Sequence, residues 1–232
     1  MSFVARNNLS RLAELNFCDK WGSHFYTRHY QQHFQHLRTK PIRVLEIGVG
    51  GYDLPEEGGA SLRMWRSYFR NAQITGIDIQ DKSPHEEDRI KIYKGSQTDA
   101  TLLQRMHDER GPFDLIIDDG SHMNEHVISS FETLFPLLSL GGIYAVEDTQ
   151  TSYWKTMGGD GTDRNNPSTM LNFFKGLTDC LNFMEFECPG YEPTYYDTHI
   201  VGMHFYHNLV FIEKGTNDEK SNRIVDFELP KR

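Results

Sequence analysis

The sequence feature that most constrains the fold is an alternation of short apolar runs with helical stretches. Residues 43–49, 73–79, 90–94, 113–118 and 142–147 have the length and composition of buried strands. Between these runs, residues 61–69, 99–109 and 124–138 have the apolar spacing of helices. Such alternation predicts right-handed crossovers and a parallel sheet that helices cover on both faces.

The last third of the chain departs from this pattern. Residues 200–206 and 209–213 are rich in strand-forming residues, and only His207 and Asn208 separate them. This spacing predicts a hairpin, so the last strand should run antiparallel to its neighbour. The sequence thus predicts an α/β fold with a mostly parallel, seven-stranded sheet.

At 232 residues, the chain has the length of one large domain. We expect a helical N-terminal segment over 1–40, the α/β domain over 41–215 and a peripheral tail over 216–232. Within the domain, residues 168–183 have helical spacing, whereas residues 151–167 are polar and rich in glycine. This stretch is long for a connector, which is typical of a lid or binding loop.

Composition argues against several classes of partner. The chain has 24 basic and 33 acidic residues, a net charge of −9, so we expect no broad affinity for nucleic acid or for anionic membranes. No apolar run approaches the ~18 residues of a membrane span, and the N-terminus lacks the apolar core of a signal peptide. Three dispersed cysteines suit neither a disulfide scaffold nor a thiolate zinc site. We therefore expect a soluble, cytoplasmic protein.

Paired carboxylates end two of the expected strands. Asp118 and Asp119 follow one, Glu147 and Asp148 end the next, and His122 lies close by in sequence. Because carboxyl ends of parallel strands line the ligand crevice, these groups should meet. Carboxylate oxygens favour hard cations such as Mg²⁺, and an imidazole ordinarily titrates near neutral pH and suits a general base. Helix capping is the alternative, and it explains only the first pair.

His122 and His126 also match H-x-x-E-H, the inverted zinc-protease motif. That motif requires both histidines on one helix so that they share a zinc ion. Here His122 directly follows a strand and a turn, which places it at the helix entrance. A zinc hydrolase is therefore disfavoured.

Acidic residues also surround a glycine turn after the first expected strand. The turn contains Gly48 and Gly50, but Asp53 stands where the dinucleotide fingerprint has a third glycine. The acids around this turn are Glu46, near the end of the first strand, Asp78, at the end of the second, and Asp99, after the third. Carboxylates suit ribose hydroxyls and cationic groups and repel phosphates, which favours S-adenosylmethionine over NAD(P). For each acid alone, a solvated strand end or a helix N-cap is the alternative.

Aromatic side chains gather in two polar segments of the last third. They are Tyr153, Trp154, Tyr191, Tyr195 and Tyr196. Flat rings with polar tips suit amphipathic ligands such as sugars, and they equally suit loop packing. Both interpretations stay open at this point.

Several short motifs, with the gaps between them, resemble one family across residues 19–211. The motifs begin at Asp19, Leu45, Gly76, Gly95, Ile117 and Glu147, and read DKWG, LEIGVGG, GIDI, GSQTD, IDDGSH and EDTQ. They resemble the metal- and S-adenosylmethionine-dependent O-methyltransferases of macrolide and other natural-product sugars, such as the mycinamicin and macrocin enzymes. The larger members carry an additional N-terminal domain, whereas about 40 residues precede the first expected strand here.

The resemblance implies a class I methyltransferase (Rossmann-like) fold and a role for each motif. It implies Mg²⁺, with Mn²⁺ as a substitute, on Asp119, Glu147 and Asp148, and His122 as the general base. The residues expected to contact S-adenosylmethionine are Glu46, Gly48, Gly50, Asp78, Asp99 and Asp118. The acceptor would be a sugar hydroxyl on a glycosylated natural product or an oligosaccharide. We also expect a homo-oligomer.

Three alternatives stay open. The first keeps the donor and methylates a phenol or catechol. The second is an oxidative enzyme, because cephalosporin-hydroxylase-type sequences share this domain. The third is a non-catalytic binding protein. The intact set of strand-end acids and His122 argues against this alternative, whereas the fold alone could not.

Overall fold

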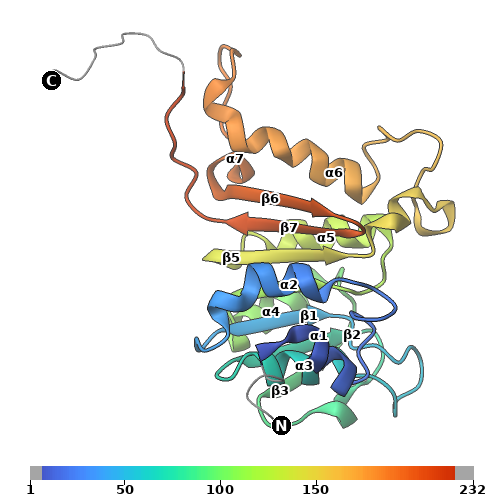
Figure 1. Ribbon diagram of the computed structural model, residues 1–232. Coiled ribbons are helices and arrows are strands. Elements are labelled where there is room, and N and C mark those ends of the chain that lie inside the picture. Colours follow the sequence, from blue (N-terminus) through green and yellow to red (C-terminus); the bar gives the residue numbers. More distant parts are fainter. Residues whose placement is uncertain (1–6, 223–232) are drawn as a thin grey trace, which may run out of the picture.

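The computed structural model describes residues 7–222 and shows a seven-stranded sheet in the order β3-β2-β1-β4-β5-β7-β6 (Figure 1). The strands are β1 (Arg43–Ile47), β2 (Gln73–Asp78), β3 (Ile90–Lys94), β4 (Phe113–Asp118), β5 (Leu138–Glu147), β6 (Ile200–Tyr206) and β7 (Leu209–Lys214). β7 pairs antiparallel with β5 and β6, and every other pair is parallel. The predicted mostly parallel sheet, with its last strand antiparallel, is confirmed.

Helices cover both faces of the sheet. The α-helices are α1 (Leu9–Leu15), α2 (Thr27–Phe34), α3 (Ala60–Tyr68), α4 (Ala100–Arg110), α5 (Asn124–Leu134), α6 (Met170–Gly176) and α7 (Tyr195–His199). The 3₁₀ turns are η2 (Gln35–Leu37), η3 (Ser83–His85), η4 (Thr149–Tyr153), η5 (Lys155–Met157) and η6 (Leu177–Glu185). None of these described helices has both the length and the apolar character needed to cross a membrane.

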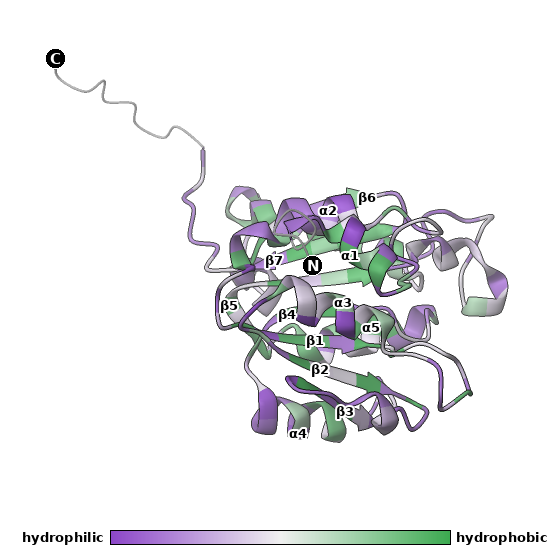
Figure 2. Cartoon of the chain, turned by 60° about the horizontal axis from the view of Figure 1, so that its bottom comes forward, coloured by the Kyte–Doolittle hydropathy of each residue, from purple (hydrophilic) through white to green (hydrophobic). Residues whose placement is uncertain are grey.

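Alternate side chains of each strand enter opposite hydrophobic layers. On β5, Ile143 and Ala145 join the core beneath α1, α2 and α3, whereas Tyr144 and Val146 join the core beneath α4, α5 and α6. Figure 2 shows the resulting pattern, with hydrophobic strands inside and hydrophilic residues on the outer helices. Because helices cover both faces of the sheet, the strand sequences are continuous apolar runs.

The helix expected over 124–138 is shorter than predicted, and the strand expected from 142 is longer. α5 ends at Leu134 and β5 begins at Leu138. Pro136 lacks the N–H that a continuing helix would need. The buried Lys214 ammonium then donates to the carbonyls of Phe135, Pro136 and Leu138 at 3.0, 2.8 and 2.6 Å. These bonds bind the turn to β7, a contact that no local pattern reveals.

The single helix expected over 168–183 is also divided. α6 ends at Gly176, and the chain continues as the 3₁₀ segment η6 from Leu177. Glycine has low helix propensity, and Asn182 leaves helical backbone angles. α6 packs against α5, whereas η6 packs against α7 and β6.

The start of the expected lid, 151–167, is fastened to the fold. The buried Asn124 amide donates to the carbonyls of Thr151 and Met157 at 3.1 and 2.8 Å. Its oxygen accepts from the Met170 backbone N–H at 2.7 Å. One side chain therefore joins the first half of this stretch, and the start of α6 that follows it, to the first turn of α5.

The expected N-terminal segment and C-terminal tail are described only in part, because residues 1–6 and 223–232 lie outside the described range. The start of the tail packs against the domain. The Asn217 amide donates to the carbonyls of Cys180 and Asp197 at 3.1 and 2.9 Å. The boundary expected at residue 216 therefore does not coincide with the end of packed structure.

The three free cysteines should differ in reactivity. Cys188 is exposed, whereas burial raises the pKa of Cys18 and of Cys180 to about 12. Because the thiolate is the nucleophile, a raised pKa leaves little of it near neutral pH. A chromogenic thiol reagent should therefore modify one thiol quickly in the native protein and all three in urea. Fast native labelling of Cys18, located by mass spectrometry, would contradict this packing.

Candidate functional site

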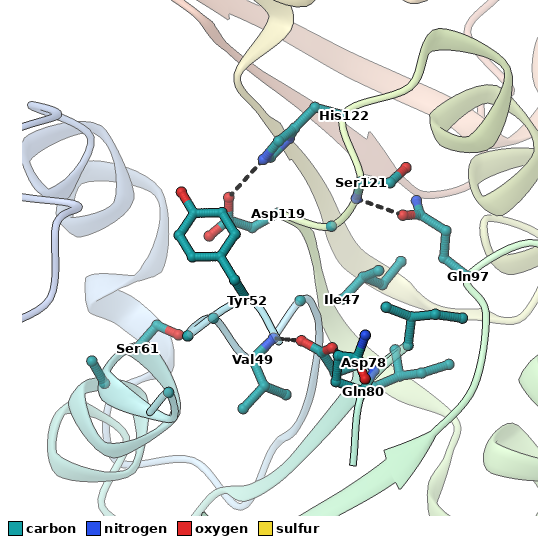
Figure 3. A pocket seen from close by; sticks show the side chains of 18 of the residues that line it. Ile47, Val49, Tyr52, Ser61, Asp78, Gln80, Gln97, Asp119, Ser121 and His122 are labelled. Carbon is teal, nitrogen blue, oxygen red and sulfur yellow. Dashed lines mark hydrogen bonds and ion pairs between the residues drawn. The ribbon is translucent and has the colours of Figure 1, made fainter. Parts of the chain in front are cut away.

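A cavity of about 830 Å³ opens at the carboxyl ends of the parallel strands. This volume lies within the ~300–1,000 Å³ typical of small-molecule sites. The segments that line it include the β1 turn, the residues after β2 and β3 and the turn after β4 (Figure 3). Asp148 after β5, the start of α3 and residues of the N-terminal segment also line it. The cavity therefore lies where the sheet topology predicts a ligand.

The glycine turn after β1 forms one wall. Gly48 has φ +89°, and a Cβ at this position would lie 2.1 Å from the Asp119 carbonyl oxygen. Only glycine lets the β1 turn approach the β4 turn so closely. The Asp78 carboxylate accepts from the Val49 backbone N–H at 2.9 Å (Figure 3). Gly48, Gly50 and Asp78 thus all lie at the cavity, as predicted for donor-binding residues.

Glu46 lies beneath this wall and does not line the cavity. It is fully buried and accepts from Ser61 Oγ at 2.7 Å and Trp65 Nε1 at 3.1 Å. Burial raises the pKa of the Glu46 carboxyl. Ser61, at the start of α3, is the member of this group that faces the cavity.

Asp99 and Asp118 are not brought to the cavity either. Asp99 caps α4 by accepting from Leu102 N at 3.0 Å. Asp118 is buried and accepts from Ser130 Oγ at 2.7 Å, and burial raises its pKa to about 6. The residue that does reach the cavity here is Gln97, which joins Asp118 to the Ser121 backbone N–H.

Asp119, His122 and Asp148 meet at the opposite wall. Each offers one ligand atom, and the three atoms lie within 4.8 Å of one another. His122 Nε2 lies 3.8 Å from Asp119 Oδ1 and 3.6 Å from Asp148 Oδ2. His122 Nδ1 has no hydrogen-bond partner within the described residues. Of the four acids predicted to meet at His122, Asp119 and Asp148 do so, whereas Asp118 and Glu147 do not line the cavity.

The backbone at this wall is strained. His122 and Asp148 have φ values of +55° and +54°, in the left-handed region. Non-glycine residues rarely adopt these angles, at a cost of about 1–3 kcal/mol, and such strain clusters at functional sites. Each strained residue directs its side chain into the same cavity.

A buried lysine from the N-terminal segment joins the acids. Lys20 Nζ lies 2.5 Å from Asp119 Oδ2, 2.7 Å from Glu147 Oε1 and 3.4 Å from Glu46 Oε1. Burial alone would lower the pKa of Lys20, but the three carboxylates raise it well above its usual range. The lysine therefore stays charged and neutralises acids from three strand ends.

Two tyrosines from the same segment complete the layer beneath the acids. Tyr30 OH donates to Glu147 Oε1 at 2.6 Å, and Tyr26 OH donates to Asp148 Oδ1 at 2.6 Å. Although burial favours the neutral acid, the Tyr26 hydrogen bond helps to hold the pKa of Asp148 below its usual range. Burial instead raises the pKa of Glu147, and repulsion from Asp119 adds to that shift.

Lys20, Tyr26 and Tyr30 received no role from the sequence. Lys20 belongs to the DKWG motif that carries the family resemblance, which was the available signal. Its contact with Asp119 spans 99 positions, and no local spacing predicts it. Gln97 was likewise missed, although it lies in the GSQTD motif.

The placement of side chains also bears on the zinc-protease motif and on the aromatic residues of the last third. α5 begins at Asn124, so His122 precedes the helix and the zinc-protease motif lacks its required context. The aromatic side chains of Tyr191 and Tyr195 bond to Asp197 and to the Pro136 carbonyl. None of the five aromatic residues Tyr153, Trp154, Tyr191, Tyr195 and Tyr196 lines the cavity, and a role of these rings in acceptor binding stays a prediction.

The side chains at this wall fit a hard divalent cation. Asp119 and Asp148 provide carboxylate oxygens close enough together for one ion, and His122 Nε2 lies beside them. Glu147 lies outside this trio, but it shares the Lys20 ammonium with Asp119. Oxygen-rich donor sets of this kind suit Mg²⁺ or Mn²⁺.

Removal of the buried ammonium should destabilise the fold. Lys20→Met leaves Glu46 and Glu147 buried without their counter-ion, and breaking such pairs costs about 3–5 kcal/mol. Urea unfolding should show this loss, whereas the exposed Lys40→Met control should change stability by less than about 0.5 kcal/mol. Adding Glu147→Gln should recover part of the loss, because the two changes share one interaction. Equal stability of Lys20→Met and wild type would contradict this account.

Comparison with curated proteins gives close relatives. The chain is 48% identical over 217 residues to demethylmacrocin O-methyltransferase of Streptomyces fradiae, covering 93% of this chain and 55% of that protein. It is 46% identical over 214 residues to a tetracenomycin rhamnosyl 3'-O-methyltransferase of Streptomyces olivaceus, covering 91% of this chain and 55% of that protein. The chain thus spans about half the length of the curated relatives it matches.

Solved structures of similar proteins have the same fold. The MycE methyltransferase of mycinamycin biosynthesis, in complex with Mg and SAH, superposes with a TM-score of 0.91 at 47% identity, covering 95% of this chain and 58% of that one. Its complex with Mg, SAH and mycinamycin VI gives 0.88 at 48% identity, covering 92% and 55%. The sheet is therefore that of a class I methyltransferase.

A family model described as rhamnosyl O-methyltransferase/CmcI matches residues 37–182, which include the glycine turn and both pairs of strand-end acids. With this match and the close relatives, the chain belongs to the rhamnosyl O-methyltransferase/CmcI family.

Proposed function

We propose that this protein is a Mg²⁺-dependent O-methyltransferase that moves a methyl group from S-adenosylmethionine to a sugar hydroxyl. The observation that carries the proposal is the convergence of Asp119, Asp148 and His122 in one cavity with the glycine turn. One wall of this cavity suits the donor, and the opposite wall suits a cation and a base. The family relatives act on sugar-bearing natural products, which supports the same acceptor class here.

The donor would occupy the glycine-turn wall. Gly48 and Gly50 allow close approach to the backbone, and Asp78 presents a carboxylate there that suits ribose hydroxyls. Glu46 acts from below, through Ser61, while Asp99 and Asp118 hold α4 and the β4 turn in place. We propose that Gly48, Gly50 and Asp78 contact the donor. Glu46, Asp99 and Asp118 would have supporting roles.

The cation would be held by Asp119 and Asp148, with Glu147 as the third acid. When bound, Mg²⁺ supplies a Lewis acid that lowers the pKa of a hydroxyl group. Lys20 and the two tyrosine hydroxyls fix the carboxylates before any ligand arrives. Mn²⁺ should substitute, because it favours the same oxygen ligands.

His122 would take the proton from the acceptor hydroxyl. Its Nε2 faces the two carboxylates, so this nitrogen is the proposed proton acceptor. The sugar oxygen then forms its bond to the methyl carbon as the carbon–sulfur bond breaks, which leaves S-adenosylhomocysteine. Holding both reactants at one cavity should supply much of the acceleration.

The acceptor would enter at the exposed mouth of the cavity. Phe17 and Tyr52 line this mouth and are 93% and 90% exposed. Exposed rings beside a polar site suit the apolar part of a glycosylated natural product. The lid role of 151–167 and homo-oligomer formation stay predictions.

A methyl-transfer assay tests the proposed function. The protein, labelled S-adenosylmethionine and a panel of demethylated macrolides, rhamnosides and catechols should give labelled product with a sugar acceptor. Chelation should abolish turnover, and Mg²⁺ or Mn²⁺ should restore it, because the proposed reaction needs a divalent cation held by the acids. Labelled catechol alone would establish the phenolic alternative, and turnover without metal would overturn the metal assignment.

Replacement of His122 tests the base. A positioned general base contributes about 10²–10⁴-fold, so His122→Ala should lower kcat by that factor. Calorimetry should show almost unchanged affinity for S-adenosylhomocysteine, since the glycine-turn wall is intact. His126→Ala is the matched control, because His126 also lines the cavity but bonds only to the Ser121 and Glu125 side chains. Normal kcat in His122→Ala would place the base elsewhere.

A further inference from the structure

A second group of potential metal ligands lies away from the cavity. His33 on α2, His204 on β6 and Glu213 on β7 each offer one ligand atom, and these atoms lie within 4.8 Å of one another. None of the three lines the cavity. The proposed methyl transfer uses none of them.

The separations match those of a tetrahedral site. His204 Nε2 lies 3.1 Å from Glu213 Oε1, and His33 Nδ1 lies 3.6 Å from the same oxygen. Ligands about 2.0–2.2 Å from a tetrahedral zinc ion are about 3.4 Å apart. Little movement would therefore bring all three onto one ion.

The buried ligand is already oriented. His33 Nε2 lies 3.0 Å from Tyr206 OH, and its ring stacks on Phe211 with centroids 4.4 Å apart. These contacts leave Nδ1 facing Glu213. A metal-bound histidine usually has such a partner on its second nitrogen, which fixes the tautomer and the ring. Tyr206 is itself held by stacking on His29 at 3.8 Å.

The other two ligands face solvent in part. His33 is 7% exposed, whereas His204 and Glu213 are 40% and 36% exposed. An ion can thus enter from solvent and keep one position for water, as in zinc sites with three protein ligands.

We propose that His33, His204 and Glu213 form a second metal site, selective for Zn²⁺ and similar transition metals. Two imidazoles with one carboxylate suit these ions better than Mg²⁺, which prefers oxygen. The ion would join α2 to the β6–β7 hairpin. Because α2 carries Tyr30, and Tyr26 directly precedes it, the site stabilises the element that supports Glu147 and Asp148.

Co²⁺ is a suitable probe, because its visible spectrum reports a tetrahedral environment. Metal-free, tag-free protein is titrated with Co²⁺ in excess Mg²⁺, which occupies the oxygen-rich site. Wild type should bind one equivalent with tetrahedral absorption, and Zn²⁺ should displace it. His204→Ala and Glu213→Gln should lose this absorption, whereas His207→Ala, an exposed histidine in the same hairpin, should retain it.

Thermal unfolding gives an independent measurement. Zn²⁺ should raise the Tm of wild type and of His207→Ala, but not that of His204→Ala. Equal melting of the metal-free proteins shows that the variants fold. No tetrahedral absorption in wild type, or the same absorption in His204→Ala, would overturn the proposal and leave an imidazole–carboxylate pair. Neither result would affect the methyl-transfer assay, since the two sites share no residue.

Discussion

The site depends on one buried ammonium group. Lys20 is 1% exposed and contacts acids from the ends of β1 and β5 and from the turn after β4. Without a cation, like charges so close together in a region of low dielectric would repel one another strongly. The lysine therefore allows the sheet to bring three carboxylates to one edge. The cost of burying the Lys20 ammonium is offset only because all three carboxylates surround it.

This interaction makes the N-terminal segment part of the site. Lys20, Tyr26 and Tyr30 bond to Asp119, Asp148 and Glu147 from beneath, while α2 packs on the sheet through the core that contains Phe34. The carboxylate oxygens thus have fixed positions before a ligand binds. Preorganised charges of this kind need little reorganisation during reaction.

Local backbone preferences are violated where the cavity forms. His122 and Asp148 adopt left-handed angles, and Gly48 permits a contact that a Cβ would block. Each violation brings a functional group closer to the others. Surrounding hydrogen bonds maintain the strain: Thr151 Oγ1 donates to the carbonyls of His122 and Asp148 at 2.8 and 3.2 Å. Conflict between local preference and global fold is typical of functional sites.

The sequence by itself determined the sheet, because buried strands between covering helices require continuous apolar runs, and the hairpin turn fixed the antiparallel strand. It also predicted that the acids at two strand ends meet with His122, since parallel strands end at one edge, and Asp119 and Asp148 do so. The helix expected to reach residue 138 was wrong, because the turn at Pro136 is held by Lys214, far away in sequence.

Only the tertiary structure decided which acids line the cavity. Asp99 caps α4 and Asp118 is buried, although Asp118 ends its strand as Asp78 does and Asp99 lies shortly after β3. The strand-end pattern is the same for Asp78 and Asp118, and the difference lies in what packs above the side chain. Lys20 shows the same limit, because a contact across 99 positions leaves no periodic trace in the sequence. Ion pairing and burial between distant segments become visible only when the chain is folded.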